Sequence, residues 1–439
     1  MKIMTRLAGG VLSLLLAANT MAQANDKLDW FRDAKLGIFI HWGIYSVDGV
    51  DESWSFHNKK MSYPAYMAQL KGFTARNYKP DEWAALIKES GAQYTVITTK
   101  HHDGAALYDS KVSQLDVVNA TPAKRDLLTP FFKAIRQQGL KAGAYFSLID
   151  WSRDDYPGFL KDSNRYEVKN DTARWNHFIQ FCHAQINEVM DNWNPDLVWF
   201  DGDWEHSDAE WNAPLIRKNI LDRNPHAIIN ARLRGYGDYA TPEQHIPVSK
   251  PTGDVWELCM TSNQNWGYHP DDTAYKTPYE LISIFADVIS NGGNLLFDIG
   301  PREDGWIPAE QVHLLNELGR WNKKHYEAIF GTRAGLPYGH FYGPSTLSKD
   351  SSTLYLFMPS NAAGKAVIKG LKNEIESVEV VGSGTNLHHK VVGKISWSTV
   401  PGIVYLDDIP ADSRDEYMTV LKLKLKGKLS LYRGHGGFN

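Results

Sequence analysis

The first residue that could carry chemistry is Asp201, a carboxylate at the end of an apolar run. Residues 196–201 read Asp-Leu-Val-Trp-Phe-Asp, and a short continuous apolar run is typical of a buried strand. Because side chains alternate along a strand, Trp199 is expected on the same side as Asp201. Gly202 allows a sharp turn after the strand. Asp201 is therefore a candidate nucleophile; the alternative is a carboxylate that caps a following helix.

Two glutamates further along the chain are candidates for a proton donor. Retaining cleavage of a glycosidic bond requires two carboxyl groups about 5–5.5 Å apart, one as nucleophile and one as acid/base. Glu257 lies in the apolar run 255–259, where burial would raise its pKa and suit it to donate a proton. Glu243 lies in a polar loop that could reach over a bound sugar. The structural alternatives are a buried ion pair of Glu257 with Arg232 and a helix-start carboxylate at Glu243.

Histidines follow two other apolar runs. His41 comes after residues 36–40, and His101, His102 and Asp103 come after residues 94–100. Neutral imidazoles can bind sugar hydroxyl groups, and three histidines with an aspartate could also form a metal site. We favour hydroxyl binding, because these histidines lack the i, i+4 spacing of a helical metal site.

The sequence alternates between apolar runs and helical stretches. The predicted strands are Leu36–Trp42, Tyr94–Lys100, Leu140–Ser147, Asp196–Asp201, Ala227–Arg232, Asp254–Cys259 and Asn294–Ile299. The predicted helices between them include Pro80–Ser90, Leu127–Gln138, Arg174–Asn192 and Thr277–Ser290. This alternation implies a parallel sheet with right-handed crossovers. It fits a (β/α)8-like TIM barrel better than an open sheet, and the candidate residues gather at the C-terminal strand ends, the catalytic face of a barrel.

The pattern changes after about residue 335. Helical patterns stop, and short β-rich runs follow with turn clusters between them, which predicts a C-terminal antiparallel β-sandwich. The expected strands are Thr353–Met358, Ala366–Ile368, Ser377–Val381, Lys394–Trp397, Gly402–Leu406 and Met418–Lys424. We therefore expect a catalytic barrel at residues 25–335 and a sandwich at residues 336–439.

The N-terminus predicts export. A basic stretch with Lys2 and Arg6 precedes an apolar run at 7–18, and Ala-Gln-Ala at 22–24 fits the small-x-small cleavage rule. We interpret residues 1–24 as a signal peptide rather than a buried helix, and expect a secreted or periplasmic product. No other apolar run has the length needed to span a bilayer.

The composition limits the classes of function. With 47 basic and 51 acidic residues the net charge is −4, which argues against a nucleic-acid binder. The 15 Trp, 21 Tyr and 17 Phe residues fill cores, and a few of them could stack on sugar rings. The two cysteines, Cys182 and Cys259, are expected to be separate buried thiols.

Several motifs, taken in order, resemble the α-L-fucosidases of glycoside hydrolase family 29. They are WFxxAKLGIFIHWG at 30–43, YxxxxTKHHDG at 94–104, WFDG at 199–202, WE at 256–257, WGY at 266–268 and NGGNLLxxIGP at 291–301, where x marks positions outside the motif. The resemblance runs from Trp30 to about Gly331. It implies a (β/α)-barrel followed by a β-sandwich, retaining hydrolysis of terminal α-L-fucose from a fucosylated glycan or glycoconjugate, and no metal or other cofactor.

The resemblance also implies roles for individual residues. It assigns Asp201 as the nucleophile. The residues that it carries over to the sugar are His41, His101 and His102 as hydroxyl ligands, Trp54, Trp199 and Trp266 as pocket walls, and Tyr145 and Arg232. The acid/base does not transfer by motif, because family members place it in different segments. Of the two candidates we favour Glu257, on the Trp-Glu match, over Glu243.

Other functions remain open at this point. They are a hydrolase for another sugar such as a galactoside, a non-catalytic sugar-binding protein, and a metal-dependent hydrolase that uses His101, His102 and Asp103. A barrel fold hosts many chemistries and does not decide between them.

Overall fold

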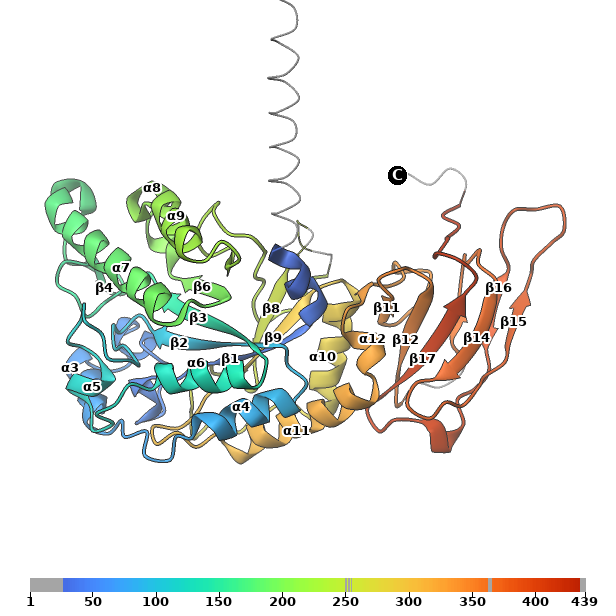
Figure 1. The fold of residues 1–439 in the computed structure, drawn as a ribbon, viewed down its shortest axis with the longest axis horizontal. Coiled ribbons are helices and arrows are strands. Elements are labelled where there is room, and N and C mark those ends of the chain that lie inside the picture. Colours follow the sequence, from blue (N-terminus) through green and yellow to red (C-terminus); the bar gives the residue numbers. More distant parts are fainter. Residues whose placement is uncertain (1–26, 249–250, 252, 254, 362–364, 435–439) are drawn as a thin grey trace, which may run out of the picture.

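The computed structural model describes residues 27–434, apart from 249, 250, 252, 254 and 362–364. The expected signal peptide at 1–24 lies outside this part of the chain. The barrel and its helices form one end of the molecule, and the antiparallel sheets form the other (Figure 1). Within the described residues, no helix has both the length and the apolar character required to cross a membrane.

Seven parallel strands form the barrel sheet, in the order β7-β6-β3-β2-β1-β9-β8. Their bounds are β1 (Leu36–Ile40), β2 (Tyr94–Lys100), β3 (Lys141–Ser147), β6 (Leu197–Asp201), β7 (Ile228–Ile229), β8 (Glu257–Thr261) and β9 (Asn294–Ile299). Nearly every residue in them is buried, because side chains fill the interior and helices cover the outside. The predicted barrel is confirmed, and β2 and β9 have the predicted bounds.

An irregular segment at residues 238–244 closes the gap between the edge strands β7 and β8. On one side, the Asp238 N–H donates to the Ile229 carbonyl at 2.7 Å; on the other, the Ala240 N–H donates to the Val255 carbonyl at 3.2 Å. Isolated parallel bridges continue this pairing along β8. The segment thus takes the place of an eighth strand, and the chain follows the ring in sequence order.

Helices cover the outside of the barrel. The long ones are α4 (Pro80–Glu89), α6 (Leu128–Gln137), α7 (Thr172–Trp193), α9 (Ala213–Arg223), α10 (Pro278–Ser290) and α11 (Ala309–Lys324). The short ones are α2 (Trp54–His57), α3 (Tyr63–Ala68), α5 (Val117–Ala120), α8 (Asp208–Trp211) and α12 (Tyr326–Ile329). α10 shows why such a helix begins where it does. Thr277 and Glu280 form a capping box, and Pro278 occupies the first turn.

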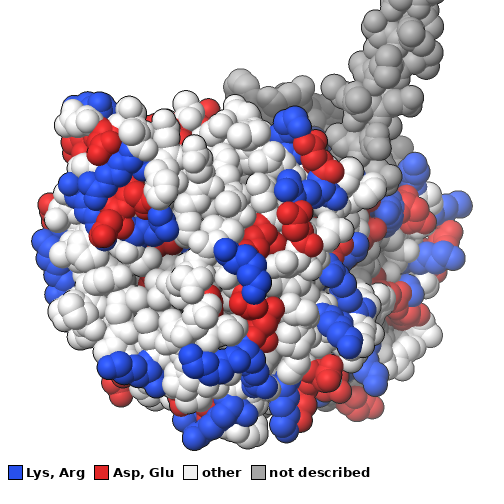
Figure 2. Space-filling model, turned by 60° about the vertical axis from the view of Figure 1, so that its left-hand side comes forward, with Lys and Arg blue, Asp and Glu red and all other residues white. Residues whose placement is uncertain are grey.

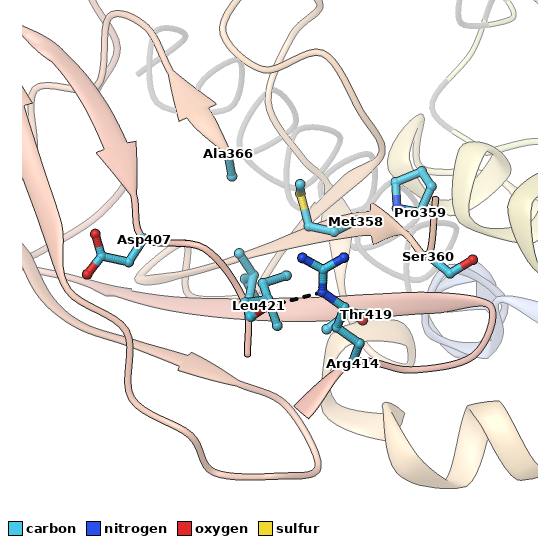
Figure 3. Close-up of a pocket in the computed structure, with 9 residues that line it drawn as sticks. Met358, Pro359, Ser360, Ala366, Asp407, Arg414, Thr419 and Leu421 are labelled. Atoms are coloured by element: carbon cyan, nitrogen blue, oxygen red, sulfur yellow. Dashed lines mark hydrogen bonds between the residues drawn. The ribbon is translucent and has the colours of Figure 1, made fainter. Parts of the chain in front are cut away.

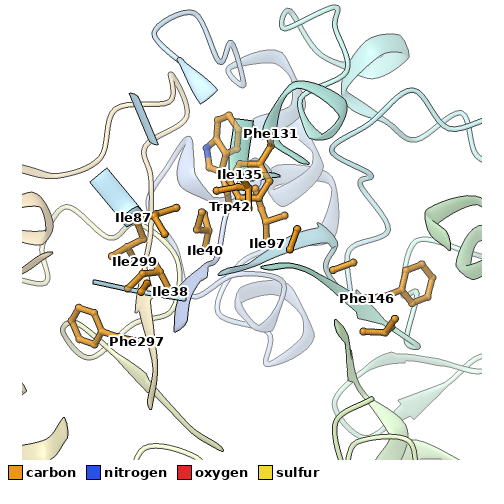
Figure 4. Packing of buried hydrophobic residues seen from close by; sticks show 14 of the residues in the cluster. Ile38, Ile40, Trp42, Ile87, Ile97, Phe131, Ile135, Phe146, Phe297 and Ile299 are labelled. Atoms are coloured by element: carbon orange, nitrogen blue, oxygen red, sulfur yellow. The ribbon is translucent and has the colours of Figure 1, made fainter. Parts of the chain in front are cut away.

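The core lies between the barrel strands and these helices (Figure 4). Ile38, Ile40 and Ile97 on the strands belong to one buried apolar cluster with Ile87 of α4 and Phe131 of α6. Burying large aliphatic and aromatic side chains of this kind stabilises the fold by roughly 1.5–3 kcal/mol each. Both cysteines are free and buried, which confirms the prediction of separate thiols.

The C-terminal part contains two antiparallel sheets. Their orders are β10-β11-β12-β17-β14 and β13-β16-β15. The strands are β10 (Arg333–Ala334), β11 (Ser345–Leu347), β12 (Thr353–Pro359), β13 (Val367–Ile368), β14 (Ile375–Val380), β15 (His389–Val392), β16 (Ile403–Leu406) and β17 (Met418–Leu425). The two sheets share a buried core that includes Leu356, Ile368, Leu406 and Leu423, so the predicted sandwich is confirmed.

Two details of the sandwich prediction differ from the structure. Residues Lys394–Trp397, expected as a strand, form a coil and turn after β15. Trp397 and Ile395 are exposed there, and without a buried face their β propensity does not suffice to hold a strand. In addition, the sandwich includes the short strand β10, which begins at Arg333, was not among the expected strands and pairs with β11.

The described chain also contains a short hairpin and several short 3-10 turns. The hairpin strands β4 (Gly158–Leu160) and β5 (Ser163–Asn164) lie between β3 and α7. Short 3-10 turns include η1 (Ile44–Ser46) and η4 (Asp203–Glu205). On the side of the barrel shown in Figure 2, acidic and basic side chains are interspersed.

Candidate active site

A pocket of about 470 Å³, including its open mouth, lies at the C-terminal ends of the barrel strands. Its lining comprises Phe39, His41, Trp54, His101, Tyr145, Trp199, Asp201, Trp204, Arg232, Glu243 and Trp266. All site residues expected from the sequence except His102 and Glu257 are therefore brought together here. This is the end of a barrel where catalytic groups are normally found.

Asp201 is the last residue of β6, and its side chain faces the pocket. The Tyr145 hydroxyl donates to its Oδ2 at 2.8 Å, and the Arg232 Nη1 donates to its Oδ1 at 2.8 Å. Gly202 has a φ of +84° and turns the chain away immediately afterwards. The following turn η4 has no side-chain cap, so Asp201 does not act as a helix cap. Both oxygens are instead oriented by donors inside the pocket.

Arg232 links the two carboxylates of the pocket. Its Nη1 contacts Asp201, its Nη2 donates to Glu243, and its guanidinium lies 4.6 Å from the Trp199 ring centroid. Although burial opposes the charged form, the negative charges around the guanidinium raise the pKa of Arg232. The guanidinium cation thus lies between the two carboxyl side chains and contacts both of them.

Glu257 lies outside this pocket. The expected strand placed it near a C-terminal strand end, but β8 begins with Glu257, which puts it at the opposite end of the strand. Its side chain is fully buried and accepts hydrogen bonds from Tyr94, Tyr239 and Trp199. Burial raises its pKa to about 7, as expected. The alternative ion pair with Arg232 does not form.

Glu243 lies in the irregular segment that closes the barrel. It bridges to Cys259 of β8 and does not begin a helix, so its structural alternative is not seen either. Its side chain is 40% exposed, at the mouth of the pocket. Of the two candidate acid/base residues, Glu243 is the one that reaches the pocket containing Asp201.

The three histidines share one arrangement. Each Nδ1 contacts a side-chain oxygen: His41 that of Asp298 at 2.7 Å, His101 that of Ser53 at 2.5 Å and His102 that of Ser147 at 2.5 Å. The Nε2 of each ring is therefore the free end. Burial lowers all three pKa values, that of His101 to about 4. The rings are neutral at pH 7 and can exchange hydrogen bonds with hydroxyl groups.

His102 does not line the pocket but lies directly behind Asp201. Its Nε2 is 3.7 Å from Asp201 Oδ2 and has no hydrogen-bond partner although it is buried. A buried polar atom without a partner is costly.

Three residues that matter here were not identified from the sequence. Phe39 of β1 lies two positions before His41. Side chains two positions apart lie on the same face of a strand, so the pattern could have predicted Phe39. Asp298 interrupts the apolar strand β9, and this interruption was its signal. Trp204 lies three positions after Asp201 in a turn, where no periodicity marks it.

No cluster of three or more His, Cys, Asp or Glu side chains suited to a metal ion occurs in the described part of the chain. Asp103 was expected beside His101 and His102 in a metal site, but both of its carboxylate oxygens accept hydrogen bonds from other residues. Its Oδ2 accepts a hydrogen bond from Tyr66 at 2.5 Å, and its Oδ1 accepts one from the Ala105 N–H at 2.9 Å.

Comparison with known proteins decides the family. The alpha-L-fucosidase family model matches residues 16–327, which is well over half of the chain. This chain belongs to the alpha-L-fucosidase family. It is therefore a glycoside hydrolase of family 29, as its motifs indicated.

Named alpha-L-fucosidases are similar to this chain in sequence and in structure. Mouse tissue alpha-L-fucosidase is 31% identical over 69% of this chain and 71% of its own length. A putative alpha-L-fucosidase of Caenorhabditis elegans is 30% identical over 80% of this chain and 74% of its own. Alpha-L-fucosidase isoenzyme 1 from Paenibacillus thiaminolyticus superposes with a TM-score of 0.82 at 29% identity, over 92% of this chain and all of that one.

A fourth relative carries mechanistic information about itself. An alpha-L-fucosidase of Bacteroides thetaiotaomicron superposes with a TM-score of 0.81 at 26% identity, over 92% of this chain and 96% of its own. It was solved as a trapped covalent intermediate with 2-fluoro-fucosyl fluoride, in a variant with glutamine in place of a glutamate.

A separate, narrow cavity lies in the C-terminal sandwich (Figure 3). Met358, Ala366 and Leu421 contribute apolar walls, and Asp407 and Arg414 the charged groups. The Arg414 Nε is already bonded to the Ile409 carbonyl at 3.2 Å. With one carboxylate only, this cavity lacks the pair that glycoside cleavage requires.

Proposed function

We propose that the protein is a retaining exo-α-L-fucosidase that removes terminal α-L-fucose from oligosaccharides or glycoconjugates. The observation that carries the proposal is the pair Asp201 and Glu243, joined by one guanidinium group across a pocket of buried histidines and aromatic rings. Contact of both carboxylates with Arg232 brings them close together, as a double-displacement mechanism needs.

In the first step Asp201 attacks the anomeric carbon of the bound fucose. The bond from that carbon to the leaving-group oxygen breaks, and Glu243 gives its proton to that oxygen. Tyr145 and Arg232 fix the attacking carboxylate, so little reorientation is needed. The product is a covalent fucosyl ester of Asp201.

In the second step water replaces the ester. Glu243, now ionised, takes a proton from the water as its oxygen attacks the anomeric carbon, and Asp201 leaves as a carboxylate. The same residue serves as acid and then as base. The trapped intermediate of the Bacteroides relative, obtained with a glutamate replaced, supports this pairing of a covalent ester with a glutamate.

The pocket fits a deoxy sugar. Neutral imidazoles of His41 and His101 line it for hydroxyl groups, while Phe39, Trp54 and Trp266 supply apolar wall. Fucose carries a methyl group where most hexoses carry a hydroxymethyl group, and an aromatic wall is the expected complement of that methyl group.

The nucleophile is tested with an aryl α-L-fucoside. The parent should hydrolyse it, Asp201→Gly should lose at least about 10³-fold in kcat, and azide should restore part of that loss by forming fucosyl azide. A folded parent that leaves aryl α-L-fucosides intact but cleaves aryl galactosides would replace this function with that of another glycosidase.

The acid/base is tested by varying the leaving group. Glu243→Ala should lose about 10²–10⁴-fold on a fucoside with a sugar leaving group, which needs protonation. It should lose much less on 2,4-dinitrophenyl fucoside, which does not. Glu257→Ala is the matched comparison, and a leaving-group dependence seen there instead would return the role to Glu257.

We also propose export, on the basis of the sequence at residues 1–24. If this is right, the protein recovered from the periplasm or the medium begins at Asn25 by N-terminal sequencing. Full-length protein retained in the cytoplasm would contradict it.

A further inference from the structure

Trp204 has an unusual position for an aromatic residue of this pocket. Five pocket residues are almost completely buried: Phe39, His41, His101, Tyr145 and Trp199. By contrast Trp204 is 42% exposed, and the other strongly exposed group of the lining is the Glu243 side chain at 40%. The two therefore mark the mouth of the pocket.

In an exo-acting pocket the terminal sugar occupies the buried end. Only its anomeric substituent points outward, so groups at the mouth meet the leaving group. Glu243 is placed there to protonate the leaving-group oxygen. The exposed indole of Trp204, which lines the same pocket, offers an apolar face of the size of one pyranose or aryl ring.

The backbone under Trp204 is held on both sides. The Asp203 carbonyl accepts a hydrogen bond from Trp211 Nε1 at 3.1 Å, and Asp203 Oδ2 accepts one from the Arg234 N–H at 3.1 Å. On the other side, the Tyr156 hydroxyl donates to Glu205. An exposed ring on a fixed turn loses little freedom when it binds a ligand.

The ring itself is also oriented. It lies nearly parallel to Trp54, at an interplanar angle of 17° and a centroid distance of 6.4 Å. His102 meets it edge-on at 6.2 Å. These contacts use part of the indole, and the exposed part remains for a ligand at the mouth.

From this geometry we propose that Trp204 is the leaving-group platform of the enzyme. It selects fucosides whose leaving group is a ring, either a second sugar or an aryl group, over fucosides with a small leaving group. The inference rests on the proposed fucosidase function and adds the part of the substrate that lies outside the fucose pocket.

The test compares three substrates whose leaving groups differ in kind. They are a fucosylated disaccharide, 4-nitrophenyl α-L-fucoside and α-L-fucosyl fluoride, whose fluoride leaving group has no ring. Trp204→Ala should lower kcat/KM for the disaccharide and the aryl fucoside about tenfold more than for the fluoride, which corresponds to about 1.4 kcal/mol of stacking. Trp204→Phe, which keeps a smaller ring, should fall between the parent and Trp204→Ala.

The control is Trp306→Ala. Trp306 is 56% exposed and lines a different cavity, beside Lys79 and Trp83, so all three substrates should react as with the parent. An equal loss on the three substrates in Trp204→Ala, or no loss on any, would overturn the inference while leaving the fucosidase function intact. Failure of the parent to hydrolyse any of the three would instead refute the function itself.

Discussion

At the scale of single residues, the molecule separates two buried carboxyl environments. Asp201 receives a cation and a phenol hydroxyl in an open pocket, whereas Glu257 receives two phenol hydroxyls and an indole N–H in the closed interior of the barrel. Trp199 connects the two environments. Its Nε1 donates a hydrogen bond to Glu257, and its ring stacks on Tyr145, the residue that donates to Asp201, at a centroid distance of 5.7 Å. Glu257 thus lies in the barrel interior, in contact with the Trp199 ring that lines the pocket.

The raised pKa of Glu257 gives a pH dependence of stability. Its ordinary pKa is 4.5 and its folded value is about 7, so the folded protein favours the neutral form. This contribution is fully present below pH 4.5 and is lost as the pH rises to about 7.

Glu257→Gln removes that titration. From pH 5 to pH 8, the free energy of unfolding of the parent should fall relative to that of the variant by about 2 kcal/mol, measured with urea at each pH. Glu243→Gln, at an exposed side chain, is the comparison and should follow the parent. A constant difference between Glu257→Gln and the parent across this range would show that Glu257 keeps an ordinary pKa.

Most of the candidate site could be predicted from residue types and their local pattern, but the choice between Glu257 and Glu243 could not. Asp201, His41 and His101 were found because each is polar and follows an apolar run, a local signal. Glu257 was preferred over Glu243 for the same local reason. Which end of a strand a residue occupies depends on where pairing begins, and pairing is a property of two segments.

At the scale of elements, the regular strands were predictable and the closing segment was not. β2 and β9 are continuous apolar runs and have the predicted bounds. Residues 238–244 contain Pro242 and few apolar side chains and therefore resemble a loop. Their place in the barrel depends on backbone hydrogen bonds, which a pattern of side chains does not predict.

This segment positions Glu243, so its displacement should affect catalysis. A Cβ at Gly237 would lie 2.4 Å from the Asn230 carbonyl oxygen and 2.6 Å from Ala231 Cα. Gly237→Ala must therefore shift the backbone just before the segment. A misplacement of about 1 Å in a catalytic group can cost about 10²-fold in rate, and we expect kcat to fall by that order on a disaccharide substrate.

Gly235→Ala is the matched control for this prediction. Gly235 has a φ of +73° but open space around its Cβ position. The change should cost about 1 kcal/mol of stability and leave kcat close to that of the parent. Equal kcat values for the two variants would show that the segment tolerates displacement at Gly237.

At the scale of the whole molecule, the barrel and the sandwich share a core. Trp321 of α11 is fully buried, donates to the Met418 carbonyl at 2.9 Å and lies 6.1 Å from the Phe357 ring. Lys324 adds an ion pair with Asp415 at 2.8 Å. One apolar cluster includes both barrel residues and sandwich residues such as Val420. We therefore expect the parent to unfold in a single calorimetric transition.

Trp321→Ala tests whether that shared core couples the two parts. Truncating a fully buried tryptophan should cost about 3–5 kcal/mol, and both parts should lose stability together because the cavity lies between them. Pocket residues all come from the barrel, so kcat should be unchanged at temperatures well below unfolding. Trp397→Ala, at a side chain that is 84% exposed, should change stability by less than about 0.5 kcal/mol. If calorimetry of Trp321→Ala showed a barrel transition at the parent temperature and an earlier sandwich transition, the two parts would be independent, and the sandwich would not contribute to the stability of the catalytic barrel.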